Sequence, residues 1–400
     1  MSALDTSIPV LLLGGRENAL AVARNLGRLG VTIYSSGKPG SRSMDSKYCT
    51  QAFIVPEGTE AADHWHDLLL ANPTSKLQGC IVFACCDESL DFLQSNRDQL
   101  AEHYKLEEFV PEQRRTMLNK QATLEIAGRI GVPAPAYWEI NSDEDVEKIR
   151  DEVRLPVMVK PLDSFAFVHE FGAKLFIVDT VFDDVVKKVK LARSRGQEVM
   201  VVEMIPGPDD LLSSYYTYRT ADGRRLYDYT KSVIRRWPVN RGGACFHQSE
   251  WLPETAEMGQ KLFDGVDWHG IGNVEFKRDT RDGQLKIIEV NARFTAAHRL
   301  VTAAGAPIDE IIYRHLTDQG IPEFESYSNK LRMIYPIGDF MAYLELRQSK
   351  QLSLLGWLKT VFAQPAVVPD FSFGDPYPAL AEWALIMRRG FGKLFGIFRR

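Results

Sequence analysis

The sequence predicts a protein of mixed α/β and α+β class: an open parallel sheet comes first, a larger region of strands and helices follows, and a helical tail ends the chain. A strand-helix-strand pattern opens the chain, short strands with tight turns follow residue 111, and helical periodicity returns after residue 325. The expected domains are therefore residues 1–110, 111–325 and 326–400.

The opening unit is expected to be doubly wound. Residues 8–13 form an apolar strand, an amphipathic helix follows, and residues 31–34 and 79–84 supply further parallel strands. Gly14 and Gly15 invite comparison with a dinucleotide site. The segment GGRENA lacks the later glycine of that fingerprint, so a structural turn is favoured over an NAD-dependent oxidoreductase.

Composition limits the classes of function. With 400 residues, 45% of them hydrophobic and 25% charged, the chain is expected to be a soluble globular protein. Its formal charge of -5 gives no general attraction to nucleic acid, so no nucleic-acid partner is expected. The five cysteines contain no CxxC pair, which argues against a disulfide framework or a zinc site and favours a reducing, cytoplasmic setting.

The middle region is expected to begin with a helix over residues 114–130 and to continue as strands. Asp222-Gly223 and Asp282-Gly283 are hairpin signals between strand-like runs. The strand candidates are residues 157–160, 174–178, 199–204, 211–218, 225–233, 272–277 and 285–290.

Three oxygen-bearing side chains are predicted to share one face of the hairpin around Asp282-Gly283. Glu275 lies on its first strand, and strand alternation places Glu289 and Asn291 on the same face of the second. Mg²⁺ takes a few such oxygens and completes its octahedron with phosphate and water. A magnesium-nucleotide platform is one interpretation, and a solvated strand face is the other.

Glu275 together with Glu289-x-Asn291-x-Arg293 resembles the metal-binding signature of the ATP-grasp superfamily. Over roughly residues 8–320 the chain looks closest to the carboligase group that includes D-aspartate ligase, and more distantly resembles carbamoyl phosphate synthase and biotin carboxylase. The resemblance implies a pre-ATP-grasp domain, a two-lobed ATP-grasp domain with a central lid subdomain at about 133–205, and a C-terminal extension. It also implies ATP and Mg²⁺, or Mn²⁺ in its place, as cofactors.

Other segments resemble the nucleotide-binding motifs of that superfamily in the same order. They are MLNKQATLEIAGRIGVPAPAYWEI, LPVMVKPLDS and VMVVEMIPG. By this resemblance the nucleotide ligands are Lys120 and Lys160 at the phosphates, Glu203, Met204 and Ile205 at the adenine, and Asp210 or its neighbour Asp209 at the ribose. Two separated lysines and a divalent ion would stabilise the charge of a transferred phosphoryl group.

Three basic residues are expected to face substrate. The resemblance points Arg293 at a carboxylate or acyl-phosphate, which suits a planar bidentate donor, while a structural ion pair is the alternative. Lys231 and Arg235 follow a predicted strand and are expected to face substrate or phosphate, with an exposed basic loop as the alternative.

The loop after Lys160, DSFAFVHEFGAK, departs from the family pattern because it has a single glycine where many ATP-grasp enzymes carry a glycine-rich lid over the phosphates. Lys174 is expected to contribute in its place. This departure keeps a second hypothesis open, namely a nucleotide-binding regulatory protein with a degenerate site.

The leading hypothesis is an ATP-dependent ligase that activates a carboxylate as an acyl-phosphate and couples it to an amine or similar nucleophile. Its expected partners are small-molecule carboxylate and amine substrates, with a homodimer as a further expectation. The last stretch, LIMRRGFGKLFGIFRR, interleaves apolar and basic residues without an acid. It is expected either to lie on the anionic inner face of a membrane or to pack on the body of the protein.

Overall fold

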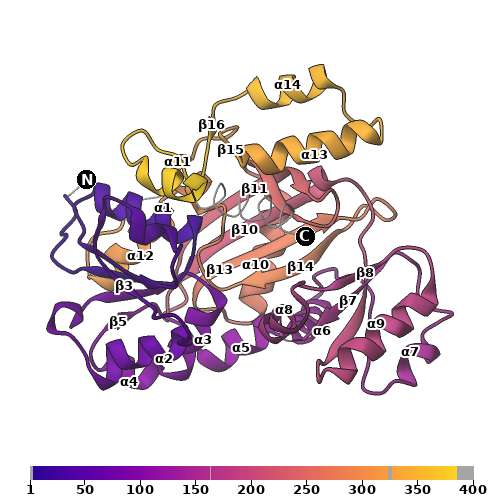
Figure 1. Ribbon diagram of the computed structural model, residues 1–400, viewed down its shortest axis with the longest axis horizontal. Coiled ribbons are helices and arrows are strands. Elements are labelled where there is room, and N and C mark those ends of the chain that lie inside the picture. The colour runs from indigo at the N-terminus through magenta and orange to yellow at the C-terminus, as the bar shows by residue number, and fades with distance from the viewer. Residues whose placement is uncertain (1–2, 163, 323–326, 385–400) are drawn as a thin grey trace, which may run out of the picture.

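The computed structural model describes residues 3–162, 164–322 and 327–384. These residues form three sheets (Figure 1), with a seven-stranded sheet between a five-stranded sheet and a four-stranded one. None of the described helices combines the length and the apolar character needed to cross a membrane. The basic end of the chain, residues 385–400, lies outside the described residues.

The five-stranded sheet confirms the doubly wound opening unit, because all its strand pairs are parallel and its order is β3-β2-β1-β4-β5. Its strands are β1 (Val10–Leu13), β2 (Ile33–Gly37), β3 (Cys49–Ile54), β4 (Ile81–Ala84) and β5 (Lys105–Leu106). The helices of this unit are α1 (Glu17–Arg28), α2 (Ala61–His66), α3 (Asp87–Ser95) and α4 (Arg97–Ala101).

Gly14 and Gly15 form the turn from β1 into α1. Both have positive φ, 66° and 80°, which glycine adopts without strain. A Cβ on Gly14 would lie 2.4 Å from the sulfur of Cys86, so the turn also needs glycine for close packing. The interpretation of this pair as a structural turn agrees with that geometry.

The helix predicted over residues 114–130 is two helices, α5 (Pro111–Leu118) and α6 (Lys120–Ile130). Asn119 separates them, and its side chain accepts hydrogen bonds from the backbone nitrogens of Gln121 and Ala122. This N-cap satisfies amide groups that the start of a helix leaves free. Lys120 is therefore the first residue of a helix.

The four-stranded sheet has the order β6-β9-β7-β8 and only antiparallel pairs. Its strands are β6 (Tyr137–Glu139), β7 (Val157–Pro161), β8 (Phe176–Val178) and β9 (Val199–Glu203). The helices α7 (Asp145–Lys148), α8 (Ser164–Phe171) and α9 (Phe182–Ser194) accompany it.

The expectation of a loop after Lys160 is wrong, because α8 occupies that segment. The helix brings the ring of Phe167 within 4.6 Å of Phe171, one turn away, and within 5.1 Å of Phe176 on β8. Aromatic packing at helical spacing thus accounts for a helix in a segment without glycine before residue 172.

The seven-stranded sheet has the order β14-β13-β10-β11-β12-β15-β16. Its strands are β10 (Leu212–Arg219), β11 (Arg225–Trp237), β12 (Gly243–Ser249), β13 (Gly270–Arg278), β14 (Leu285–Asn291), β15 (Arg332–Ile334) and β16 (Ala366–Val367). The helices are α10 (Pro253–Gly265), α11 (His298–Ala303), α12 (Ile308–Leu316), α13 (Pro336–Gln348) and α14 (Leu354–Phe362). Both predicted hairpins are present, as β10-β11 and β13-β14.

The residues after 325 are not only helical. β15 pairs with β12 and β16 pairs with β15, so this part of the chain extends the central sheet. The two helices α13 and α14 lie between these strands in the sequence and cover one end of the molecule (Figure 1).

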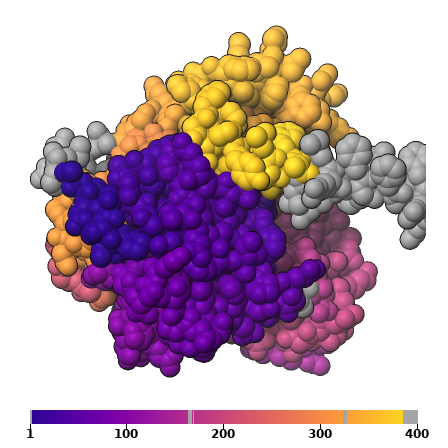
Figure 2. Space-filling view, turned by 60° about the vertical axis from the view of Figure 1, so that its left-hand side comes forward, coloured from indigo at the N-terminus to yellow at the C-terminus, as the bar shows by residue number. Residues whose placement is uncertain are grey.

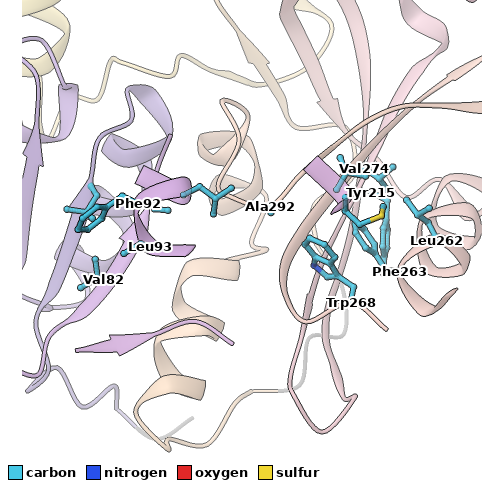
Figure 3. Close-up of a cluster of buried hydrophobic side chains, with 14 of the residues drawn as sticks. Val82, Phe92, Leu93, Tyr215, Leu262, Phe263, Trp268, Val274 and Ala292 are labelled. Atoms are coloured by element: carbon cyan, nitrogen blue, oxygen red, sulfur yellow. The ribbon is translucent and has the colours of Figure 1, made fainter. Parts of the chain in front are cut away.

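One hydrophobic core joins the first unit to the central sheet. Val82 and Phe92 of the first unit and Phe263, Trp268 and Val274 beside the central sheet belong to the same buried cluster (Figure 3). Because these side chains pack as one core, the two units are expected to hold a fixed mutual position.

A C-terminal segment, residues 368–383, lies against the first unit (Figure 2). Its main anchor is a fully buried ion pair between Arg24 Nε on α1 and Asp375 Oδ2, 2.9 Å apart. Ser46 Oγ and the backbone nitrogen of Lys47 also donate to Asp375, at 2.8 and 2.9 Å. Arg24 donates further to three backbone carbonyls of the segment.

Replacing Arg24 by methionine should destabilise the protein strongly. The change leaves the buried carboxylate of Asp375 without its counter-charge, which we expect to lower the free energy of unfolding by about 3–5 kcal/mol. Urea unfolding followed by circular dichroism measures the loss. Arg150→Met is the matched control, because Arg150 pairs with Asp183 on the exposed surface. Equal unfolding midpoints for the two variants would contradict the anchoring role.

Candidate functional site

A cavity of about 1340 Å³ lies where the first unit, the other two sheets and the C-terminal segment meet. The residues that line it come from regions of the chain that are far apart in the sequence. The predicted site residues that line it are Lys160, Lys174, Met204, Ile205, Lys231, Glu275, Glu289, Asn291 and Arg293.

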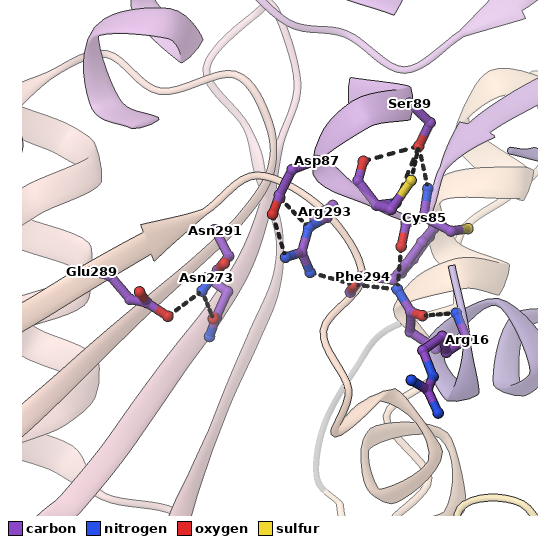
Figure 4. A network of polar contacts seen from close by, with 11 residues as sticks. Arg16, Cys85, Asp87, Ser89, Asn273, Glu289, Asn291, Arg293 and Phe294 are labelled. Carbon is purple, nitrogen blue, oxygen red and sulfur yellow. Dashed lines mark hydrogen bonds and ion pairs between the residues drawn. The ribbon is translucent and has the colours of Figure 1, made fainter. Parts of the chain in front are cut away.

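Two carboxylates and two amides occupy one face of β13 and β14. Glu275 is paired with Glu289 across the strands, and Asn273 with Asn291. Asn291 Nδ2 donates to Asn273 Oδ1 at 3.3 Å and lies 3.5 Å from Glu289 Oε1 (Figure 4). The predicted convergence of Glu275, Glu289 and Asn291 is therefore present in the structure.

The pKa of Glu275 is raised by its burial and then by the charge of Glu289, against the opposing effect of Lys231. Two facing, half-buried carboxylates repel each other, and a divalent cation between them would relieve that repulsion. Among the described residues no three His, Cys, Asp or Glu side chains gather into a metal cage. The oxygen donors of Glu275, Glu289 and Asn291 fit Mg²⁺, which keeps several positions for phosphate and water.

Lys231 is a buried cation in the floor of the cavity. It lies on β11, where Ser214 of β10 stands between it and Glu275 of β13. Lys231 Nζ donates to Ser214 Oγ at 3.0 Å. Burial lowers the pKa of this lysine, and Glu275 opposes the shift. Lys231 was expected in a segment that follows a strand, but it lies inside β11, so the alternative of an exposed basic loop is wrong.

Lys160 reaches the same place from the four-stranded sheet. Its Nζ donates to the backbone oxygen of Ile288, at 3.3 Å, on the strand that carries Glu289. Burial lowers the pKa of Lys160, while Glu289 and Glu275 oppose that shift. The lysine therefore links the two sheets at the acidic pair.

Lys120 is not part of the cavity lining but belongs to the same electrostatic cluster. Burial, then the charge of Lys160, lowers the pKa of Lys120 to about 8, and Glu289 and Asp87 act in the opposite direction. Its place at the start of α6 keeps it near the cluster.

Arg293 follows β14 and lines the cavity, and its guanidinium forms a two-pronged ion pair with Asp87 at the start of α3 (Figure 4). The distances are 2.6 Å from Nε to Oδ1 and 3.2 Å from Nη2 to Oδ2. Asn18 Nδ2 also joins the carbonyls of Cys85 and Phe294, at 2.7 and 2.8 Å, so the segment after Arg293 is fixed to the first unit. The pair holds the guanidinium plane at the border between two units.

The segment after β9 lines the cavity through Met204 and Ile205. Lys277 Nζ fixes the backbone of this segment by donating to the oxygens of Ile205 and Gly207, at 3.0 and 2.7 Å. Burial lowers the pKa of Lys277 to about 8. The apolar side chains and fixed backbone of this segment suit a flat ring.

Some predicted residues do not face the cavity. The carboxylate of Glu203 pairs with Arg281 outside the lining, and Asp210 is exposed outside it. Of the two aspartates offered for the ribose, Asp209 is buried and accepts from Arg236 Nε at 2.7 Å. The side chains of Glu203 and Asp209 thus serve structural contacts.

Arg235 is directed away from the cavity, contrary to expectation. Its Nε and Nη2 pair with the carboxylate of Asp339 on α13, at 2.6 and 3.2 Å, and both side chains are buried. Adjacent residues of a strand point to opposite faces except at a bulge. The pairing of β11 with β12 shifts register next to Arg235, and this irregularity explains why its side chain does not share the face of Lys231. Lys174 lines the cavity but is itself exposed.

Several residues at or near the cavity were not predicted, and one of them, Asn273, lies beside the acidic pair but outside the lining. Asn273 could have been found from strand alternation, because it stands two residues before Glu275 on the same face. Arg42, Glu17, Glu382 and Tyr335 line the cavity. They lie far apart in the sequence, and no local pattern indicates that they meet.

No protein-family model matches the chain. Among curated proteins it is similar to the D-aspartate ligase of Enterococcus faecium (strain Aus0004), with 20% identity over 296 residues, covering 70% of each chain. It spans about half, 52%, of the D-alanine–D-alanine ligase of Heliobacterium modesticaldum, with 24% identity over 47% of this chain.

Solved structures show the same architecture. A biotin carboxylase from Campylobacter jejuni in complex with an ATP analogue superposes with a TM-score of 0.63 at 17% identity, over 82% of this chain and 75% of that one. The biotin carboxylase domain of 2-oxoglutarate carboxylase from Hydrogenobacter thermophilus, a dimer solved with MgADP and bicarbonate, gives a TM-score of 0.59 at 17% identity, over 80% and 73%. The chain therefore has the ATP-grasp fold, and its relatives in sequence and structure are ADP-forming ligases of that superfamily.

Proposed function

We propose that this chain is an ADP-forming ligase that uses Mg-ATP to activate a carboxylate as an acyl-phosphate and couples it to an amine or a related nucleophile. The observation that carries the proposal is the facing pair Glu275 and Glu289, with Lys160 and Lys231 brought to it from two different sheets. Acids for a divalent ion and cations for phosphates thus share one cavity.

The proposed reaction has two steps. A carboxylate oxygen attacks the γ-phosphorus of ATP, the bond to the β-γ bridging oxygen breaks, and ADP leaves. The nucleophile then attacks the acyl carbon, phosphate leaves with the bonding electrons, and the amine gives up a proton. Mg²⁺ bound by Glu275, Glu289 and Asn291 would supply charge neutralisation at the phosphates.

The lysines have distinct positions for this chemistry. Lys160 and Lys120, which interact electrostatically with each other and with Glu289, would bind the phosphate oxygens. Lys231 is beyond Glu275 on the same sheet face and would stabilise the acyl-phosphate. Arg293, fixed by Asp87, would orient a carboxylate or the acyl-phosphate with its remaining N–H groups.

The adenine is proposed to lie against Met204 and Ile205, in the lining near Met158 and Ile177 of the four-stranded sheet. Glu203 and Asp210 would contact the nucleotide through their backbone groups, or through side chains that change position after nucleotide binding. Lys174 would approach the phosphates from the segment that follows α8.

We also propose that residues 385–400 contact an anionic membrane surface. The tail carries Arg388, Arg389, Lys393, Arg399 and Arg400 and no acid. Basic residues near an anionic leaflet contribute about 1 kcal/mol each. We further propose that the chain forms a homodimer, as the Hydrogenobacter domain does. Analytical ultracentrifugation measures the oligomeric state directly.

Glu289→Gln should remove the Mg²⁺-dependent part of ATP binding and reduce ADP release. The substitution keeps the size of the side chain but loses the negative charge that an ion requires, and we expect a fall of about 10²–10³-fold in turnover. Calorimetry with ATP, with and without Mg²⁺, measures binding, and an ADP-release assay over carboxylate and amine libraries measures turnover.

Glu139→Gln is the control for that experiment, because Glu139 is an exposed acid on β6 outside the cavity. The control variant should behave as the unmodified protein does. Glu289→Gln with unchanged Mg²⁺-dependent binding would refute the metal role. Nucleotide binding without ADP release over the whole library would favour the regulatory hypothesis instead.

ATP binding should weaken as the pH rises through about 8. Since the pKa of Lys120 is depressed from 10.5 to about 8, its charge is lost on raising the pH through that value rather than near 10.5. Bound phosphate favours the charged form, so binding near pH 8 should take up protons. Calorimetry in buffers of different ionisation enthalpy measures this uptake.

Lys120→Arg is the control for the pH experiment, because arginine keeps its charge throughout this range. The pH dependence that remains in this variant reports on the other buried lysines of the cavity, Lys160, Lys231 and Lys277, each with a pKa lowered by burial. An identical proton uptake in the variant and the unmodified protein would assign the effect to the other buried lysines of the cavity and contradict the role of Lys120.

Deleting residues 385–400 should abolish co-sedimentation with vesicles that contain phosphatidylglycerol, because the deletion removes five basic residues. Vesicles of phosphatidylcholine alone are the control and should bind neither form. Equal sedimentation of the two forms with anionic vesicles would refute the membrane contact.

A further inference from the structure

The cavity is larger than a nucleotide site alone requires. Its volume is about 1340 Å³, whereas pockets for one drug-sized ligand measure about 300–1,000 Å³. Beyond the acidic pair it continues to the C-terminal segment, residues 368–383, and to the start of α13. The part of the cavity that a nucleotide would leave empty is therefore lined by residues outside the nucleotide-binding motifs.

Four large apolar side chains line this cavity and still remain exposed. They form an apolar rim made of Trp237, Ile337, Phe371 and Trp383, with exposed fractions of 41%, 53%, 42% and 54%. The rim draws on the end of β11, the first turn of α13 and the C-terminal segment. The floor of the cavity is polar by contrast, with Lys160, Lys231 and the carboxylate pair.

Ion pairs fix the rim in place. Phe371 and Trp383 directly follow Asp370 and Glu382, and the buried guanidinium of Arg42 pairs with both of these acids. Glu382 lies 3.0 Å from Arg42 Nη2. Two aromatic side chains from separate turns of the C-terminal segment are thus attached to one cation of the first unit.

Trp237 is held in a similar way. It directly follows Arg236, whose Nε donates to the buried carboxylate of Asp209 at 2.7 Å. Ile337 stands two residues before Asp339, the buried partner of Arg235. The rim is therefore attached at each of its segments to an ion pair, which makes it a preformed surface rather than a set of loose side chains.

Continuity with the polar floor indicates what covers the rim. An exposed apolar patch marks a binding surface when it adjoins a pocket. Other exposed apolar side chains, such as Leu355, Phe362 and Phe373, do not line the cavity. The rim differs from them because a molecule in contact with it also reaches the reacting groups.

We propose that one substrate of this ligase is amphiphilic, with a carboxylate or amine head that reaches the polar floor and an alkyl or aryl part that lies against the apolar rim. This inference deepens the proposed function and rests on it, because the ligase reaction supplies the reason for a head group at the floor. The occupant of the rim is a part of a small molecule.

Chain-length dependence of binding tests the proposal. Calorimetry on the full-length protein without ATP would use two series of probes: butanoate, octanoate and dodecanoate, and butylamine, octylamine and dodecylamine. Each buried methylene favours binding, so affinity should rise about tenfold or more from the four-carbon to the eight-carbon member of one series. The series that responds identifies the head group. Equal affinity along both series would overturn the proposal.

Variants assign the effect to the rim. Trp383→Ala and Trp237→Ala should each weaken binding of the responding eight-carbon probe by about tenfold, because each removes a large apolar contact. Trp251→Ala is the matched control, since Trp251 is 43% exposed but lies outside this cavity. Since Trp237 and Trp383 come from separate segments, a folding defect in one variant leaves the other informative. If both match Trp251→Ala, the proposal is wrong.

The outcomes separate this inference from the proposed function. Chain-length dependence that requires the rim, in a protein that never releases ADP, supports an amphiphilic ligand and refutes the ligase. ADP release that is equally efficient with short and long substrates refutes the amphiphilic substrate and keeps the ligase. If neither series binds and rim variants lose co-sedimentation with phosphatidylglycerol vesicles, the rim is a membrane contact and the inference fails.

Discussion

Repulsion between Glu275 and Glu289, which face each other on adjacent strands, is the constraint on which the site depends. Two half-buried carboxylates that face each other are stabilised by positive charge nearby. The chain supplies it from two directions, with Lys231 on the central sheet and Lys160 on the four-stranded sheet. Both lysines are desolvated, so each is costly to bury alone and favourable beside the acids. The position of the four-stranded sheet is thereby coupled to the charge at the acidic pair.

Local patterns predicted most of the fold and the centre of the site. Alternation along β14 and the position of Glu275 on β13 predicted a shared acidic face, and a register shift next to Glu275 is what places it opposite Glu289. The parallel sheet of the first unit followed from short apolar runs in the same way. Asn119 shows a local signal that was overlooked, since an asparagine before a helical run is a common N-cap. The family resemblance added Lys160, Met204 and Ile205, which line the cavity.

Long-range contacts explain what the sequence could not predict. Arg235 resembles a substrate ligand until its partner Asp339 is known, and that partner is 104 residues away on α13. The helix α8 depends on packing against Phe176 of a neighbouring strand. The ion pairs of Arg42 with Asp370 and Glu382 join the first unit to the C-terminal segment, and no periodicity within either segment predicts that contact. Contacts of this kind are set by tertiary structure, which is where single-sequence patterns lose their information.

The ion pair between Arg241 and Asp179 makes the contact between two sheets beside the cavity sensitive to salt. Arg241 belongs to the turn between β11 and β12, Asp179 follows β8 of the four-stranded sheet, and both side chains are about half exposed at 2.9 Å. An exposed pair of this type contributes little and is screened by salt. It is therefore a weak link between the central sheet and the four-stranded sheet. Moderate ionic strength would weaken this ion pair, whereas the buried ion pairs of the C-terminal segment would stay intact.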